Sequence, residues 1–193
     1  MGRLLAFLIC LPLAAEGGEW HVDRKARENQ VEYTSSVASF TFSGKTDQID
    51  GFIYWEGDSL SAEKSRFHFE VNLADFDSGI GKRDRDMRDV LDTDQWPKAV
   101  YKGEITEVSV VDSSVTAFRV ETRGTLSLHG VEREIGVPGL VLMQEERSRV
   151  EAAFSLKLAD YGIEAPSLAA FVKVSQEIDL EVSVSLAEPE EIE

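Results

Sequence analysis

The strongest constraint in this sequence is an alternation of polar and apolar residues with a period of two, which recurs in several separate stretches. Successive side chains of a β-strand point to opposite faces of a sheet, so each stretch predicts a strand with one buried and one solvated face. The inward members of the clearest stretches are Phe67, Phe69, Val71 and Leu73; Val120, Thr122, Gly124, Leu126 and Leu128; Val150, Ala152, Phe154, Leu156 and Leu158; and Val172, Val174, Ile178, Leu180, Val182, Val184 and Leu186. The pattern is typical of an antiparallel sheet that packs on one face.

Shorter strands are expected over residues 30–36, 38–43, 49–55, 99–108 and 137–144. Residues typical of turns separate the predicted strands, at Gly44, Glu56-Gly57-Asp58, Asp112-Ser113-Ser114, His129-Gly130 and Pro138-Gly139. Many short strands with hardly any helix predict an all-β fold, either a barrel or a sandwich.

One segment breaks the alternation. Residues 79–96 are strongly charged and place Met87, Val90 and Leu91 at positions i, i+3 and i+4, which predicts one short amphipathic helix near residues 82–95. Pro97 then favours a return to extended structure, because the residue before a proline disfavours the helical conformation.

Ten Phe, four Tyr and three Trp are many aromatic side chains for one modest domain. Several of them, such as Phe67, Phe69 and Phe154, fall on the inward face of predicted strands. They either fill a core or line a cavity, as in barrels of about eight strands that hold one ligand. The alternation does not separate these two interpretations.

The N-terminus has the pattern of a secretory leader. Arg3 precedes an apolar run from Leu4 to Leu13, and the small residues Ala14 and Ala15 precede a polar stretch. We therefore expect a signal peptide over residues 1–15, a periplasmic or secreted protein, a single domain over residues 20–187, and an acidic tail over residues 188–193. The only cysteine, Cys10, lies in the predicted leader, so the processed domain carries no thiol.

Charge and residue types also exclude several kinds of site. A net charge of −16 disfavours nucleic acid and anionic membrane surfaces as partners, and we expect no stable membrane insertion. The three histidines have no metal-ligand spacing, and the aspartates between Asp84 and Asp94 do not match a calcium loop. No nucleophile elbow or phosphate-binding loop occurs. We therefore expect a protein without metal, cofactor or catalytic residues.

Five motifs, in order, resemble the YceI-like family of exported polyisoprenoid-binding proteins. They are Trp20-His21-Val22-Asp23; residues 75–88, which are followed by Trp96-Pro97; Gly124-Thr125-Leu126-Ser127-Leu128-His129-Gly130-Val131, which is followed by Ile135-Gly136-Val137-Pro138; Asp160-Tyr161-Gly162-Ile163; and Ser175-Gln176-Glu177-Ile178. The resemblance runs from about Trp20 to Leu186. The chain departs from many members at Asp86, where they have histidine, and at Val90 and Leu91, where they have a pair of phenylalanines.

The resemblance implies an antiparallel, lipocalin-like barrel whose interior holds a long isoprenoid lipid of the quinone or polyprenyl type. It implies a carrier or sequestering protein, with Met87, Leu91 and Trp96 as a lid or mouth. The residues expected to contact the ligand are Phe67, Phe69, Val71, Leu73, Met87, Leu91, Trp96, Tyr101, Leu126, Leu128, Phe154, Leu156, Ile178 and Leu180. The alternative is a protein-binding β-domain of the cell envelope without a cavity. The sequence leaves a homodimer open.

Overall fold

The computed structural model describes residues 17–38, 40–56, 60–112, 116–143, 147–169 and 172–188. The predicted leader lies outside these residues, as do most of the acidic tail, two of the predicted turns and Cys10. The strands are β1 (Gly17–Val22), β2 (Gln30–Val37), β3 (Phe40–Thr46), β4 (Ile49–Glu56), β5 (Arg66–Asn72), β6 (Lys98–Asp112), β7 (Ala117–Leu128), β8 (Val131–Met143), β9 (Ser148–Lys157), β10 (Ser167–Ala169), β11 (Val172–Lys173) and β12 (Glu177–Ala187). The helical elements are α1 (Gly81–Val90) and two 3₁₀ turns, Leu73–Asp75 and Leu158–Tyr161.

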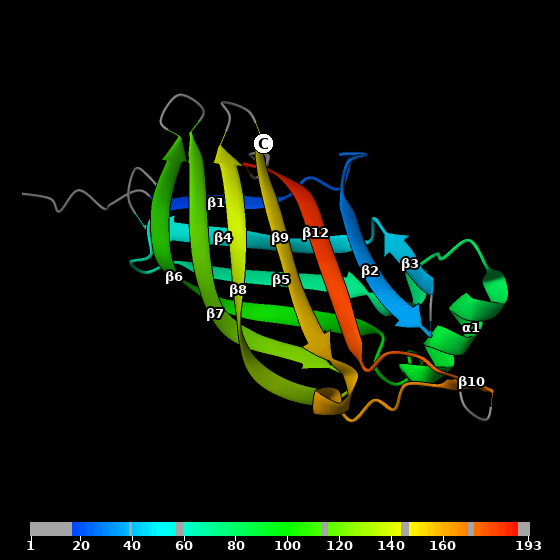
Figure 1. Ribbon diagram of the computed structural model, residues 1–193. Helices are drawn as coiled ribbons and strands as arrows, with labels where there is room; N and C mark the ends of the chain where they lie inside the picture. The colour runs from blue at the N-terminus through cyan, green and yellow to red at the C-terminus, as the bar shows by residue number, and fades with distance from the viewer. Residues whose placement is uncertain are drawn as a thin grey trace, which may run out of the picture.

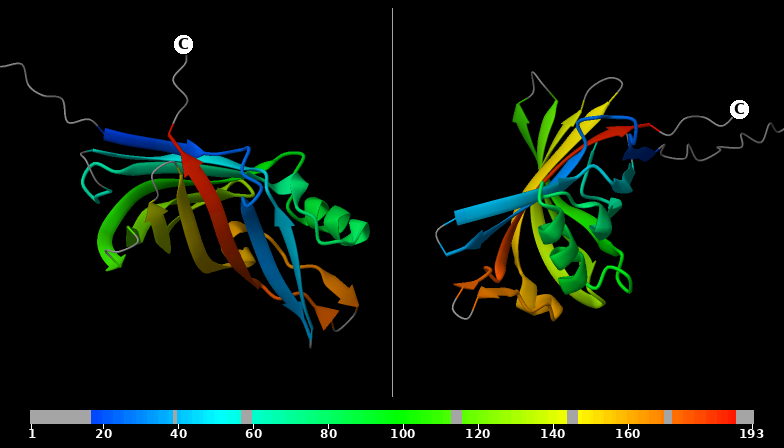
Figure 2. Two further views of the ribbon diagram at one scale, coloured as in Figure 1. Left: turned by 90° about the horizontal axis from the view of Figure 1, so that it is seen from above. Right: turned by 90° about the vertical axis from the view of Figure 1, so that its right-hand side faces the viewer.

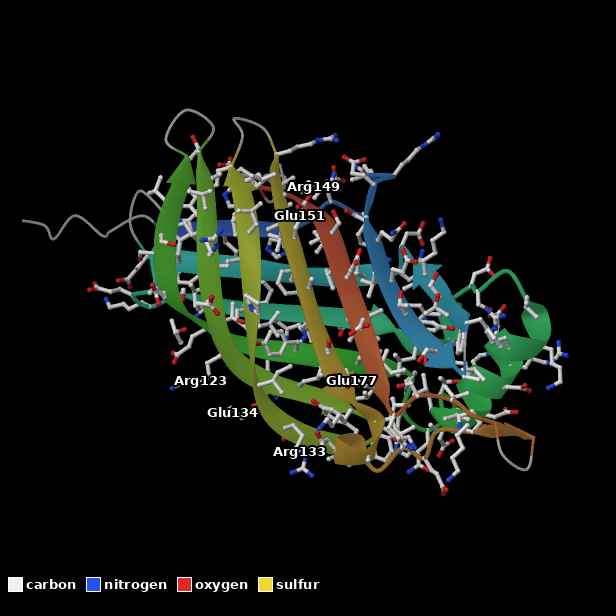
Figure 3. The ribbon with its side chains drawn as sticks, viewed as in Figure 1. Arg123, Arg133, Glu134, Arg149, Glu151 and Glu177 are labelled. Carbon is white, nitrogen blue, oxygen red and sulfur yellow. The ribbon has the colours of Figure 1, made fainter. Side chains whose placement is uncertain are left out.

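The fold is an antiparallel barrel, as predicted (Figure 1). Eight strands form the ring in the order β1-β4-β5-β6-β7-β8-β9-β12, and β12 pairs back to β1. The hairpin β2–β3 continues the sheet beyond β12, next to the part of β12 that does not touch β1. Figure 3 labels Arg149 and Glu151 of β9, which form an ion pair of 2.9 Å on the outer face of the barrel. The charged side chains of this strand thus face water, and its apolar side chains face inward.

The hairpin leaves a gap in the wall, which other segments cover. Only two residues separate the end of β3 at Thr46 from the start of β4 at Ile49. The two strands nevertheless diverge instead of pairing. Backbone hydrogen bonds between Lys45 and Asp77 (2.9 and 3.0 Å) attach the segment before α1 to β3. As a result α1 lies across this end of the barrel, as the right-hand view of Figure 2 shows.

The helix is shorter than predicted. It ends at Val90, because Asp92 adopts a left-handed conformation (φ 45°) and the backbone N–H of Thr93 bonds to the carbonyl of Arg88, the pattern of a Schellman cap. The predicted turn at Pro138-Gly139 is wrong, since both residues lie inside β8. Proline fits there because β9 pairs with β8 only from Gly139 onward, so the missing N–H of Pro138 costs no ladder bond to β9.

The long final alternation also forms two strands instead of one. The chain leaves extended pairing between Lys173 and Glu177, where the N–H of Ser175 bonds to the carbonyl of Ser36. The apolar residues keep the same parity on both sides of the break, and only the polar Gln176 marks it in the sequence.

A pair of glycines lets β6 and β7 approach closely. Gly103 and Gly124 are directly opposite each other, and a Cβ on Gly103 would lie 2.1 Å from the carbonyl oxygen of Arg123. Neither position tolerates a side chain without a shift of the backbone. This close approach lets the long β6–β7 ribbon coil and helps to close the sheet into a barrel.

The point where β12 changes neighbours is completed by a side chain. Beyond Ser183 the strand no longer pairs with β2, and it meets β1 only at Leu186. Between them, the buried Asn29 accepts a hydrogen bond from the N–H of Ser185 (2.8 Å) and donates one to the carbonyl of Asp23 (2.7 Å). Asn29 therefore replaces the missing strand and satisfies two backbone groups where the ring closes.

The substitution Asn29→Ala tests this closure. It would leave the buried N–H of Ser185 without a partner and remove one of the two hydrogen bonds to the carbonyl of Asp23, which keeps the N–H of Ala26, and we expect the free energy of unfolding to fall by about 1–3 kcal/mol. Urea unfolding followed by circular dichroism measures it, and the exposed Arg27→Ala is the control, expected within about 0.5 kcal/mol of wild type. A loss for Asn29→Ala as small as that of the control would contradict the assigned role.

Candidate ligand cavity

The two ends of the barrel differ in how they are filled. At one end Trp20 and Trp55 pack with ring centroids 6.4 Å apart, together with the fully buried Leu186, and the space left there is about 10 Å³. The rest of the interior encloses a cavity of about 770 Å³, within the range of roughly 300–1,000 Å³ typical of small-molecule sites. Thus the packed end seals the barrel and the remainder is hollow.

The cavity wall is almost entirely apolar, and strands β2 to β9 and β12 contribute to it together with α1. All but one of the ligand-contact residues expected from sequence line this cavity: Phe67, Phe69, Val71, Leu73, Met87, Leu91, Tyr101, Leu126, Leu128, Phe154, Leu156, Ile178 and Leu180. Their contact with a ligand stays a prediction. The side chains that share a face in each strand do meet in one hollow space.

Trp96 is the exception. It is absent from the cavity wall, and its ring lies against the β7–β8 turn, where a Cβ on Gly130 would come within 2.6 Å of it. The left-handed turn at Asp92 causes this, because it ends the helix and directs the chain away from the opening. Expecting Trp96 at the mouth was therefore incorrect.

The hydroxyl groups deep in the cavity are satisfied by the protein itself. The Tyr101 hydroxyl lies 2.8 Å from Oγ1 of Thr122, which donates to the carbonyl of Val137 at 2.7 Å. Burial raises the pKa of Tyr101, so the phenol stays neutral at physiological pH. These groups therefore present little unsatisfied polarity to a ligand, and the deep cavity favours a hydrocarbon.

The mouth lies between α1 and the β2–β3 hairpin. Phe40 and Ile80 belong to the cavity wall but are 55% and 50% exposed, which places them at the rim. Lys82, Arg83 and Asp86 of α1 also reach the cavity, and Lys82 is paired with Asp86 at 2.6 Å. The opening thus has a polar side, whereas the interior does not.

Several residues of this wall were not predicted from the sequence, notably Tyr33, Ser35, Phe42 and Arg83. Tyr33 and Ser35 alternate within a correctly expected strand, and Arg83 precedes Met87 by four residues on one helix face. The alternation and the spacing of four residues are both visible in the sequence, but a serine or an arginine on an inward face adds nothing to an apolar pattern.

The charged groups offer no sign of a metal centre. Within the described part of the chain there is no cluster of three or more His, Cys, Asp or Glu side chains that could hold an ion. His129 lies in the turn between β7 and β8, where its Nδ1 is 3.3 Å from the carbonyl oxygen of Tyr161. None of the helices in the described ranges is long and apolar enough to cross a membrane.

Asp84 anchors the start of α1. Its carboxylate accepts hydrogen bonds from the N–H (3.0 Å) and the hydroxyl (2.5 Å) of Ser78, and these bonds, helped by Arg88 and Arg83, hold the pKa of Asp84 below its ordinary value of 3.8. The segment leading into the helix is therefore tied to the helix itself, which fixes one side of the mouth.

Known proteins resemble this chain in sequence and in fold. A family model described as the YceI-like domain matches residues 20–186. A UPF0312 protein of Pseudomonas putida is 27% identical over 179 residues, which cover 88% of this chain and 86% of the relative. Among solved structures, BcnA of Burkholderia cenocepacia superposes with a TM-score of 0.67 at 15% identity, over 85% of this chain and 98% of BcnA. A polyisoprenoid binding domain from Saccharophagus degradans gives 0.68 at 20% identity, over 88% and 98%.

The hollow nature of the interior predicts how it responds to larger residues. Ala152 lines the cavity opposite Gly139, so we expect Ala152→Phe to lower the free energy of unfolding by less than about 1 kcal/mol. Ala117 is 4% exposed and away from the cavity wall, so Ala117→Phe should cost about 1–3 kcal/mol or more through overpacking. Urea unfolding of both variants provides the comparison, and equal large losses would mean that the interior is packed.

The anchor at Asp84 predicts a pH dependence. A carboxylate whose pKa is lowered on folding stabilises the protein fully above its unfolded pKa and loses that effect as the pH falls through the folded value. The stability difference between wild type and Asp84→Asn should therefore be largest near neutral pH and shrink in acid. Urea unfolding as a function of pH measures it, with the exposed Asp89→Asn on the same helix as control. A difference that grew on acidification would refute the anchor.

Proposed function

This chain belongs to the YceI-like family, and we propose that it binds a long isoprenoid lipid, of the quinone or polyprenyl type, inside the barrel. The observation that carries the proposal is the large apolar cavity, sealed at one end by the tryptophan cluster and open at the other beside α1. The solved relative that is a polyisoprenoid binding domain supports the same class of ligand.

The size of the cavity suits a branched hydrocarbon chain. A carbon with its hydrogens takes about as much space as a water molecule in the liquid, ~30 Å³, so the cavity holds on the order of 25 carbons, or about five C5 units. At about 0.8 kcal/mol per buried carbon unit, such a tail gains roughly 20 kcal/mol before the costs of association. Those costs are about 4–15 kcal/mol or more, so tight binding is feasible without polar contacts to the tail.

A binding role also accounts for the arrangement better than a partner-binding domain without a cavity. A domain of that kind would bury the inward faces of β5, β7, β9 and β12 against one another, and here those faces border open space. We further propose that the protein is exported and acts in the periplasm or outside the cell as a carrier or sequestering protein. The leader-like N-terminal sequence and the strongly negative charge support this.

Organic extraction of the purified protein, followed by mass spectrometry, tests the proposal. Expressed in a host that makes quinones and polyprenols, the wild type should release one such lipid, whereas Phe154→Lys should release little because a charge would face the apolar cavity. Ala153→Lys is the matched control: it lies next in sequence on the outer face, opposite Glu181, and should retain the lipid. Circular dichroism checks that both variants are folded.

Two outcomes would reject the proposal. The first is a wild-type protein that yields no long-chain lipid and fails to take up added quinone or polyprenol. The second is equal lipid content in the wild type and in a folded Phe154→Lys variant, since the lipid would then lie elsewhere on the protein.

A further inference from the structure

We propose that the cavity mouth holds a head-group subsite, formed by Arg83, Tyr33 and Ser35, which selects an isoprenoid lipid with an anionic phosphate head over a neutral one. The inference rests on the proposed function and specifies the polar end of its ligand.

The three side chains form one cluster around Phe42. Arg83 places its guanidinium 4.7 Å from the centre of the Phe42 ring, and the Tyr33 ring packs edge-on to Phe42 with centroids 6.4 Å apart. Ser35 is directly opposite Phe42 in the β2–β3 ladder, so both side chains lie on the same face of the hairpin. All four residues line the cavity. The cluster therefore connects α1 to the hairpin across the mouth.

The buried hydroxyl of this cluster lacks a protein partner, in contrast to the hydroxyl groups of Tyr101 and Thr122 deeper in the cavity. The Oγ atom of Ser35 is buried, with the residue only 4% exposed, and has no hydrogen-bond partner. No ion pair joins Arg83 to a carboxylate among the described residues. A buried hydroxyl without a partner destabilises the empty protein, so a bound group that accepts its hydrogen bond would recover that loss.

Every polar group here can donate a hydrogen bond. Guanidinium has donors only, and burial raises the pKa of Tyr33, so its hydroxyl keeps its proton. A head group that accepts several hydrogen bonds therefore satisfies all three side chains at once. Phosphate oxygens do so, and the planar guanidinium matches them with two parallel bonds.

The local charge favours an anion even though the whole chain is acidic. Lys82 neutralises Asp86, and Asp84 directs its carboxylate to Ser78 and is influenced by Arg88 more than by Arg83. Arg83 thus has no carboxylate within ion-pair distance among the described residues, and its guanidinium can still receive an anion. Salt largely screens the repulsion between a bound anion and solvent-exposed acidic groups that lie farther from it than the Debye length, about 8 Å at physiological salt. The contact with Arg83 therefore dominates over the net charge of −16.

Binding of geranylgeranyl monophosphate and geranylgeraniol, which share one tail and differ in the head, tests the subsite. Displacement of a fluorescent polyprenyl probe gives the dissociation constants. The wild type should bind the phosphate at least about tenfold more tightly than the alcohol, the effect of one charge-assisted hydrogen bond. In Arg83→Gln the two constants should become similar, mainly through weaker binding of the phosphate, and Arg83→Lys should retain part of the preference.

Arg85→Gln is the matched control, since Arg85 is exposed on the same helix and absent from the cavity wall; it should keep the wild-type preference. Equal affinity of the wild type for phosphate, alcohol and a quinone would overturn the subsite while leaving the proposed function intact. Loss of preference in Arg85→Gln as large as in Arg83→Gln would also overturn it, because a diffuse charge effect would then explain the data. Failure of the wild type to bind either tail would instead refute the proposed function.

Discussion

The closure of the sheet by the β1–β12 pairing is the interaction on which the rest of the structure depends. A barrel that encloses empty space cannot rely on a filled core along its whole length, so its backbone hydrogen bonds must hold the walls apart and in place. The closure is short, covering only His21 with Ala187 and Val22 with Leu186. Next to it the N–H of Asp23 bonds to the carbonyl of Ser185, and Asn29 completes the join by accepting from the N–H of Ser185 and donating to the carbonyl of Asp23. Without this join the wall would have two exposed edges, and the cavity would have no fixed volume.

The interior divides the requirements of stability and binding between the two ends. The tryptophan cluster with Leu186 packs like an ordinary core next to the closure, where β12 pairs with β1. At the other end the β2–β3 hairpin separates from β4, and α1 covers the gap through the Asp77–Lys45 and Asp84–Ser78 hydrogen bonds. The buried hydroxyl of Ser35 at this end has no partner, which is costly for the empty protein and consistent with a ligand whose polar head stays at the mouth.

Much of the wall follows from local pattern, and the exceptions have identifiable causes. Phe67, Phe69 and Phe154 were placed correctly on the inward face, because the direction of a side chain in a strand depends only on its position along that strand. Pro138 was predicted to be a turn residue, because proline is rarely found in a strand that is paired on both edges. The sequence does not show where β9 stops pairing with β8, and this leaves the edge of β8 at Pro138 unpaired on that side. Trp96 was placed at the mouth because the helix was expected to continue beyond Asp92.

The sequence by itself determined which side chains share a face, that the domain is all-β, and that one helix interrupts the strands. These are consequences of periods of two and of three to four residues, which are local. Only the tertiary structure decided that the shared faces enclose space instead of packing together, because that volume depends on where the sheet closes and how far the walls are apart. It also brought Arg83 of the helix over Phe42 of a distant strand, next to Tyr33 and Ser35. No spacing along the chain encodes that contact, since it arises from the fold of the whole barrel.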